Sequence, residues 1–168
     1  SVVIALRDHV VANGEIELYS TTDGGATWQQ LANGPWAKRG MVYGLVSYNG
    51  MLWLVGGGTY DVARDYYNDV WTFDGTTWTQ VLADGVAPWS AREYHNVLVW
   101  QGRLWVIDGT GAGGNVFDAW WSADGVDWAR RPTTWTGTHA DGIAGTPTSM
   151  YAGPGNHMTA NSWQIDVF

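Results

Sequence analysis

The side chains best suited to contacting a ligand lie in a loop rather than in a catalytic motif. Tyr60, Arg64 and Tyr66 fall between two apolar runs, in a stretch that is not repeated elsewhere in the chain. Tyrosine offers a flat apolar ring with a hydroxyl at its tip, which suits stacking on a sugar or anchoring a protein partner. Insertions specific to one unit of a repetitive chain often bind ligands, so we predict that these residues contact one.

A second group of candidates consists of tryptophans at matching positions in three connecting segments, together with a histidine that follows the last of them. These residues are Trp36, Trp89, Trp135 and His139. The indoles are suited to stacking on a ligand, but they are equally suited to packing between neighbouring units of the fold. The sequence leaves both interpretations open.

Motifs for cofactors and for covalent catalysis are weak. Residues 109–114 satisfy Gly-x-Gly-x-x-Gly, but a dinucleotide site needs a helix to begin there, and a strand-like run follows instead. The histidines are far apart and none lies at metal-ligand spacing from another. No nucleophile elbow or Ser/His/Asp signature is present. We therefore expect no nucleotide, no metal and no other cofactor.

The elements that must position these residues form a unit of short strands. Residues 96–100 and 103–108 are rich in β-branched and aromatic side chains, and the dipeptide Gln101-Gly102 between them predicts a hairpin. A Gly-rich turn, a third apolar run and a fourth strand anchored by Trp128 complete the unit. Four antiparallel strands in about 40 residues match one blade of a β-propeller.

The same unit occurs in residues 39–78 and again in residues 92–128, with an Asn49-Gly50 turn in the first copy. The tryptophans that close successive units are 50 positions apart, at Trp28, Trp78 and Trp128. A fixed period of this size is the sequence signature of a propeller or a solenoid.

These motifs resemble the kelch-repeat family, the galactose-oxidase-like propellers. The resemblance rests on Arg92 and His95 in an Arg-x-x-His motif, on the Gly-x-Leu-Trp hairpins, and on the Asn-Asp-Val-Trp run at 68–71. Residues 21–28 are also similar to the Asp box of sialidase-like propellers, which in that family is a structural turn away from the active site. The resemblance implies an all-β fold, a kelch-like β-propeller segment of four-stranded antiparallel blades.

The catalytic chemistry of these families does not carry over. Galactose-oxidase chemistry needs a cysteine joined to a tyrosine beside copper, and this chain contains no cysteine. Sialidase-like catalysis needs an arginine cluster, a tyrosine nucleophile and an acid. Arg39 and Arg92 occupy equivalent repeat positions, where kelch-type blades use arginine structurally. We predict that the chain is not an enzyme.

The repeats divide the chain, residues 1–168, into one propeller segment without separate domains. We expect a partial blade at 1–31, full blades at 39–82 and 92–130, and a degenerate partial blade at 139–168. Closed propellers typically have about four to eight blades. The chain is therefore a segment of a longer polypeptide, a small four-bladed ring, or a subunit whose copies complete a ring. The first and third are favoured.

Charge and hydropathy exclude two classes of partner. The formal net charge is −8, and the Lys and Arg residues total only 8 and are scattered, which argues against binding to nucleic acid. No apolar run approaches the roughly 20 residues that span a bilayer, so we expect no membrane insertion.

We expect a non-catalytic recognition module that binds a glycan or a protein surface through propeller loops. The Asp-box-like turn, low charge and Trp-rich loops resemble propellers of extracellular proteins and of phage tail or fibre proteins, which implies an extracellular or virion-surface setting. The main alternative is a structural assembly protein whose propeller edges bind its own copies or neighbouring chains. A carbohydrate-active enzyme of the sialidase-like type comes third.

Overall fold

The computed structural model describes residues 3–8, 16–39, 44–59, 63–133, 139, 142–153 and 163–166, with the backbone alone for 3–8, 16 and 163–166. Every strand pair in these ranges is antiparallel. None of the described residues lies in a helix. The prediction of an all-β protein built from antiparallel sheets is therefore confirmed.

Two four-stranded sheets form the centre of the molecule. The first joins, in chain order, β4 (Leu45–Tyr48), β5 (Met51–Gly58), β6 (Tyr66–Phe73) and β7 (Trp78–Leu82). The second joins β8 (Asn96–Trp100), β9 (Arg103–Ile107), β12 (Ala119–Ser122) and β13 (Trp128–Arg131). A short hairpin of β10 (Thr110–Gly111) and β11 (Gly114–Asn115) is inserted between β9 and β12.

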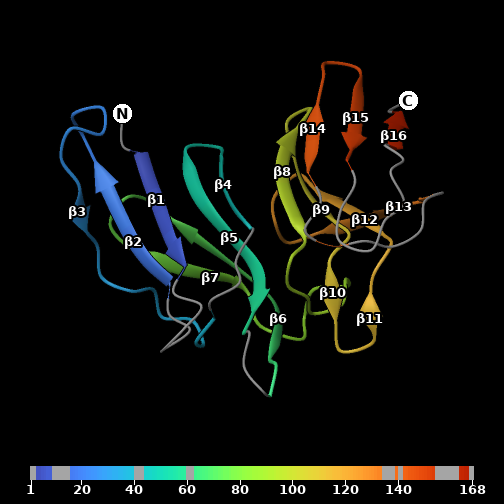
Figure 1. Ribbon diagram of the computed structural model, residues 1–168, viewed down its shortest axis with the longest axis horizontal. Helices are drawn as coiled ribbons and strands as arrows, with labels where there is room; N and C mark the ends of the chain where they lie inside the picture. The colour runs from blue at the N-terminus through green and yellow to red at the C-terminus, as the bar shows by residue number, and fades with distance from the viewer. Residues whose placement is uncertain are drawn as a thin grey trace.

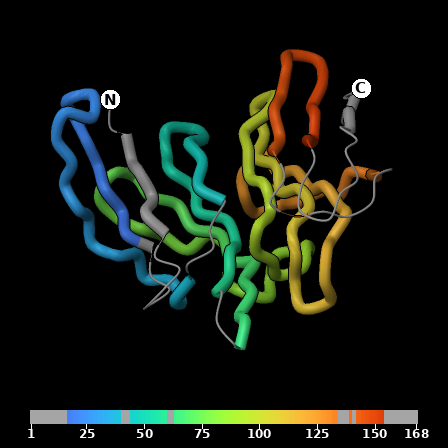
Figure 2. Tube along the Cα trace, in the orientation of Figure 1, coloured from blue at the N-terminus to red at the C-terminus, as the bar shows by residue number. Residues whose placement is uncertain are grey.

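A three-stranded sheet lies on either side of this central pair. One contains β1 (Val3–Asp8), β2 (Ile16–Thr21) and β3 (Gln29–Gln30), and the other contains β14 (Ile143–Gly145), β15 (Ser149–Ala152) and β16 (Trp163–Asp166). The first three sheets follow one another roughly from left to right in chain order, and the sheet of β14, β15 and β16 stands above the second central sheet (Figure 1). Figure 2 shows the same progression from the blue N-terminal to the red C-terminal part of the trace.

Apolar side chains fill the spaces between neighbouring sheets. Trp53 and Val55 of β5 join a buried cluster with residues of β8 and β9, such as Val97. Leu54, between them in sequence, points the other way and packs with Leu18 of β2. Successive side chains of a strand point to opposite faces. Both faces of this central sheet are therefore buried, which explains why β5 is a continuous apolar run rather than an alternating one.

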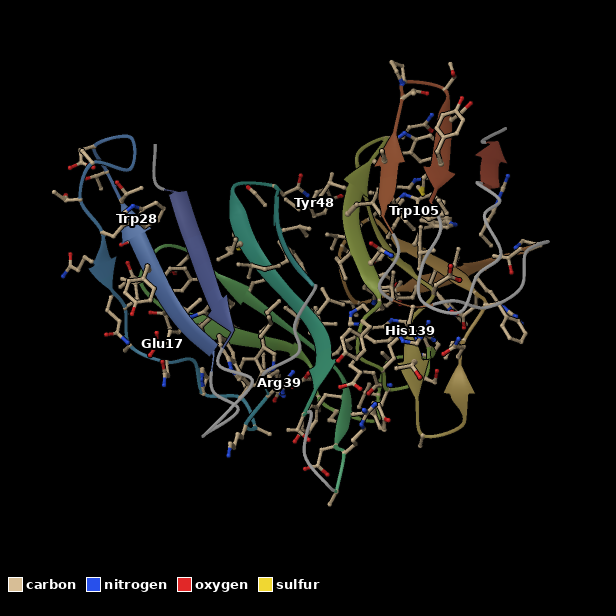
Figure 3. All side chains as sticks on the ribbon, in the orientation of Figure 1. Glu17, Trp28, Arg39, Tyr48, Trp105 and His139 are labelled. Atoms are coloured by element: carbon tan, nitrogen blue, oxygen red, sulfur yellow. The ribbon has the colours of Figure 1, made fainter. Side chains whose placement is uncertain are left out.

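A tyrosine at the end of β4 joins the two central sheets. The Tyr48 hydroxyl donates toward the carbonyl oxygens of Gly102 and Ala123, each 2.8 Å away. Tyr48 is labelled in the space between β4 and β8 in Figure 3. Its ring is buried, so the hydroxyl satisfies its hydrogen-bonding need within the protein while the ring adds to the core.

The two-residue turns have the geometry that their sequences predict. Asn49 and Gly50 have φ of 50° and 75°, and Gln101 and Gly102 have φ of 47° and 68°. Positive φ at both central residues is typical of the type I′ turn, whose twist matches that of the flanking strands. The predicted hairpins β4–β5 and β8–β9 are therefore confirmed.

The turn between β2 and β3 is held by an aspartate. The Asp23 carboxylate accepts hydrogen bonds from the Thr27 amide at 3.0 Å, the Thr27 hydroxyl at 2.6 Å and the Thr21 hydroxyl at 2.7 Å. These donors hold the pKa of Asp23 well below its ordinary value. The carboxylate thus acts within its own turn, as expected from ordinary turn chemistry.

Each central sheet contains a buried arginine–aspartate pair at the same place. Arg39 contacts Asp69 through both terminal nitrogens, at 2.6 and 2.7 Å, and Arg92 contacts Asp118 in the same two-pronged way. Both arginine side chains have 0% exposure. Paired charges of this kind orient the segment that precedes each sheet, so the repeated arginines are part of the architecture.

Candidate functional site

A cavity of about 580 Å³ lies beside strand ends of the two central sheets. The loop before β6 forms one wall, and the β10–β11 hairpin with the residues after it forms the other; the lining consists of residues 64–66, 90–91, 111–118 and Arg130. In Figure 1 this hairpin and the start of β6 lie on the same lower edge of the molecule. Cavities of this size suit small-molecule ligands.

The hairpin wall is attached to the strand segment before β8. The Glu93 amide donates to the Thr110 carbonyl oxygen, and the Thr110 amide donates to the Glu93 carbonyl oxygen, both at 2.9 Å. The Val116 amide then donates to the Gly109 carbonyl oxygen at 2.9 Å. In the first central sheet the paired ends of β5 and β6 occupy the equivalent place, where Gly57 and Gly58 pair with Tyr67 and Tyr66. The cavity therefore lies between equivalent strand ends of the two central sheets.

The cavity combines an apolar face with charged edges. Phe117 is 53% exposed, and Tyr66 on the opposite wall is half-buried. Arg64 and Arg130 contribute positive charge, and Asp65 contributes a carboxylate. An exposed aromatic ring beside polar groups can stack on a ligand and hydrogen-bond to it at the same time.

A buried acid lies directly behind this wall. Glu93 has 0% exposure, and its Oε1 accepts a hydrogen bond from Arg64 Nη1 at 3.1 Å. Its Oε2 has no hydrogen-bond partner among the described residues. Burial raises the pKa of Glu93 to about 7, and the nearby Arg64 guanidinium limits the rise. Glu93 is therefore poised to exchange a proton near neutrality.

His95, on the same segment, has a structural role. The ring is fully buried, and its Nε2 lies 2.9 Å from the Val55 carbonyl oxygen. Burial lowers the pKa of His95 to about 4, so the ring is neutral at pH 7 and Nε2 donates the hydrogen bond. The bond joins the segment before β8 to β5 and so links the two central sheets.

The sequence-predicted residues are divided between the cavity and the core. Arg64 and Tyr66 line the cavity. His139 lies behind the hairpin wall, with Nδ1 2.8 Å from Asn115 Oδ1 and its ring 5.5 Å from that of Tyr94 (Figure 3). Because Asn115 lines the cavity, His139 supports the site rather than forming its surface.

Two of the three connector tryptophans, Trp36 and Trp89, pack against other indoles. Trp89 is only 1% exposed and meets Trp128 edge to face, with ring centroids 5.7 Å apart. Trp36 is half-buried and meets Trp78 in the same way at 4.5 Å. The sequence left open whether these indoles stack on a ligand or pack between neighbouring units. In the structure, Trp36 and Trp89 both pack between units. Tyr60 and Trp135 lie outside the described residues.

Sequence reasoning missed Glu93, Phe117 and Arg130. For Glu93 a signal existed, since Gly40 occupies the equivalent position after Arg39 in the other repeat. A polar residue that replaces glycine in only one of two otherwise similar units is not required by the shared architecture. No comparable signal marks Phe117, whose exposure depends on how the hairpin folds.

The described residues contain no cluster of three or more side chains that could hold a metal ion. The same part of the chain contains no helix that could cross a membrane.

The fold places the chain among all-β proteins built from consecutive antiparallel sheets. A comparison with solved structures finds proteins with a similar fold. The chain is similar to the structure of YjhT, with 14% sequence identity and a TM-score of 0.69 over 87% of this chain. It spans 55% of the YjhT chain, about half its length. At this identity the likeness shows the fold alone. No family model and no curated protein matches the sequence.

Proposed function

We propose that the chain is a segment of a kelch-like β-propeller that acts as a non-catalytic recognition module and binds a glycan in the cavity between the β6 loop and the β10–β11 hairpin. The propeller assignment is supported by two consecutive four-stranded sheets with the same strand order and equivalent buried arginine–aspartate pairs. An extracellular or virion-surface setting follows from the resemblance to propellers of that kind.

The observation that carries the glycan assignment is the composition of the cavity wall. The Phe117 ring is more than half exposed, although burial of such a ring is favourable, and it lies among polar side chains. Sugars present an apolar face of C–H groups and a rim of hydroxyls. Arg64, Asp65 and Asn115 provide donors and acceptors for that rim. A volume of about 580 Å³ accommodates a short saccharide.

A binding role is favoured over sialidase-like catalysis because the repeated arginines are already engaged. Arg39 and Arg92 are buried in ion pairs with Asp69 and Asp118, so neither presents a guanidinium to a substrate carboxylate. The cavity itself is lined by Arg64 and Arg130.

The experiment is a glycan-array screen followed by titration calorimetry with the best saccharide. Replacing Phe117 by Ala should weaken binding at least about tenfold, the loss typical of one stacking aromatic ring. Val126→Ala is the matched control, because Val126 is 48% exposed but lies outside the cavity lining. Equal binding by F117A and the parent protein would contradict the assignment of the site.

A specific observation favours the assembly hypothesis as a second candidate. Trp78 and Trp128 are covered by connector indoles, whereas Trp28, at the equivalent place, is 45% exposed. An indole from a neighbouring blade would cover Trp28 in the same way. Light scattering on the parent protein and Trp28→Ala tests this idea. A monomer in both cases would remove the support for self-association.

A further inference from the structure

The N-terminal sheet and the two central sheets carry a tryptophan at one equivalent place, at Trp28, Trp78 and Trp128. The strand register defines this place. In each sheet the residue two positions after the tryptophan pairs with an aromatic residue of the preceding strand: Gln30 with Tyr19, Gln80 with Trp71, and Arg130 with Trp120. The sheet of β1, β2 and β3 is therefore built on the same plan as the central sheets.

An acid two residues before that aromatic residue supports the equivalence. Tyr19 donates its hydroxyl to Glu17 Oε2 at 3.0 Å. In the first central sheet, Trp71 donates its indole N–H to Asp69 Oδ2 at 2.8 Å. What applies to the surroundings of Trp78 can therefore be transferred to Trp28.

In the two central sheets, an indole from the preceding connector covers this tryptophan. Trp36 meets Trp78 edge to face, at an interplanar angle of 88°. Trp89 meets Trp128 edge to face, at 73°. In both connectors the tryptophan directly follows a proline. Because proline fixes its own φ, it limits the directions in which the next residue can be presented.

Trp28 lacks such a cover and is nevertheless held in place. Its side chain is 45% exposed, and no other aromatic ring packs against it among the residues that the structure describes. Its Nε1 donates to the Gly25 carbonyl oxygen at 3.1 Å, as Trp128 Nε1 donates to the Gly125 carbonyl oxygen at 3.1 Å. Trp28 is labelled on the first sheet, at the left of Figure 3. The ring is thus fixed in the same way with and without a covering indole, so docking needs no rearrangement of the turn.

We propose that the exposed face of Trp28 is a docking site for a Pro-Trp segment of a protein partner, whose indole packs edge to face on Trp28 as Trp36 packs on Trp78. The inference rests on the propeller assignment of the proposed function, and it names the kind of segment that the assembly hypothesis requires. Edge-to-face indole contacts combine apolar burial with a favourable ring geometry.

A second copy of this chain does not fit the site as well as a separate partner. The chain contains the dipeptide Pro-Trp twice, at 35–36 and 88–89, and both tryptophans already cover the closing tryptophan of their own sheet. Trp89 is only 1% exposed, so it cannot serve a neighbour without leaving its own core. In the third connector, Trp135 follows a threonine rather than a proline.

The test is an NMR titration of the full chain with a capped peptide that has the sequence of residues 85–91, Gly-Val-Ala-Pro-Trp-Ser-Ala. The Trp28 indole N–H resonance, identified by its loss in Trp28→Phe, should shift and saturate, whereas the Trp78 and Trp128 resonances should not move. A peptide with alanine in place of its tryptophan should bind the parent protein at least about tenfold more weakly. That comparison does not depend on the folding of any variant.

Protein variants locate the site. Trp28→Ala should weaken peptide binding at least about tenfold. Val126→Ala is the matched control, because Val126 is 48% exposed in the equivalent turn of the second central sheet, where Trp128 is already covered. It should bind the peptide as the parent protein does. Thermal unfolding checks that both variants are folded.

The remaining outcomes separate this inference from the proposed function. No shift at Trp28, or equal binding of the alanine peptide, overturns the docking site even if saccharides bind in the cavity. Self-association that W28A abolishes, without peptide binding, overturns it in favour of a second copy. Normal peptide binding by the parent protein and by Phe117→Ala, without binding of any saccharide, supports the docking site and overturns the glycan assignment instead.

Discussion

Replacing Asp69 by Ala should strongly destabilise the protein, because it leaves a buried guanidinium without its anion. Asp69 accepts hydrogen bonds from both terminal nitrogens of Arg39, at 2.6 and 2.7 Å, and from the Trp71 indole at 2.8 Å. Arg39 keeps only the carbonyl oxygens of Ala37 and Gly56, which are neutral acceptors. Breaking a buried pair by removing one partner costs about 3–5 kcal/mol.

We expect a loss of unfolding free energy near the top of that range, because the Arg39 side chain is not exposed to water. Its side chain has 0% exposure, and its guanidinium also lies over the Tyr67 ring, 4.3 Å from the centroid. Solvent therefore cannot replace the lost carboxylate without opening the segment before β4. Trp71 loses an acceptor as well, which adds the cost of an unsatisfied buried donor.

The assay is equilibrium urea unfolding followed by tryptophan fluorescence. Asp127→Ala, at an exposed position in the β12–β13 turn, is the control and should change the free energy of unfolding by less than about 0.5 kcal/mol. The double variant R39M/D69L should be more stable than D69A, because it removes both charges together. A loss below about 1 kcal/mol in D69A would refute the structural role given to the repeated arginines.

Two further predictions concern the turns and the glycines. Asp23→Ala should accelerate hydrogen exchange of the Thr27 amide at neutral pH, because the Asp23 carboxylate accepts a hydrogen bond from that amide. The pKa of Asp23 is lower in the folded protein than in the unfolded chain, so the carboxylate stabilises the turn above its unfolded-state pKa and loses this effect as the pH falls through its folded-state pKa. The exchange rates of the two proteins should therefore converge in strong acid. An unchanged Thr27 exchange rate would rule out this role. Gly58→Ala should destabilise by about 1–3 kcal/mol in urea unfolding, since its Cβ would lie 2.6 Å from the Asp65 carbonyl oxygen. Gly113→Ala, with open space around the new methyl group, should be nearly neutral, and equal effects of the two changes would contradict the packing argument.

Local features of the fold could be predicted because local chemistry determines them. Asn49-Gly50 and Gln101-Gly102 separate apolar runs of strand length, and a two-residue link with a glycine leaves an antiparallel pair little alternative to a tight turn. The β5 run is apolar throughout because both its faces are covered. The sequence also marks the loop with Arg64 and Tyr66, since it differs from its counterpart in the next repeat.

The candidate site could be predicted only in part, because burial is decided by tertiary packing. Trp36 and Trp89 have the composition of ligand-stacking residues, yet both pack against the tryptophan that closes a sheet. The sequence of a connector does not reveal whether a neighbouring strand will bury its tryptophan. Phe117 is the converse case, an apolar residue in an apolar run that is nevertheless 53% exposed.

The site lies where one repeat departs from a framework that both repeats share. Arg39 and Arg92 begin the two units and make the same contacts with aspartate and with a strand-end carbonyl oxygen. After Arg39 the sequence continues Gly-Met-Val, and after Arg92 it continues Glu-Tyr-His. The shared ion pair keeps the backbone in place, so a buried acid can be introduced beside it at position 93 without changing the sheet. A framework that is stable for reasons unrelated to the ligand is what allows Glu93 to remain buried with a partly unsatisfied carboxyl group.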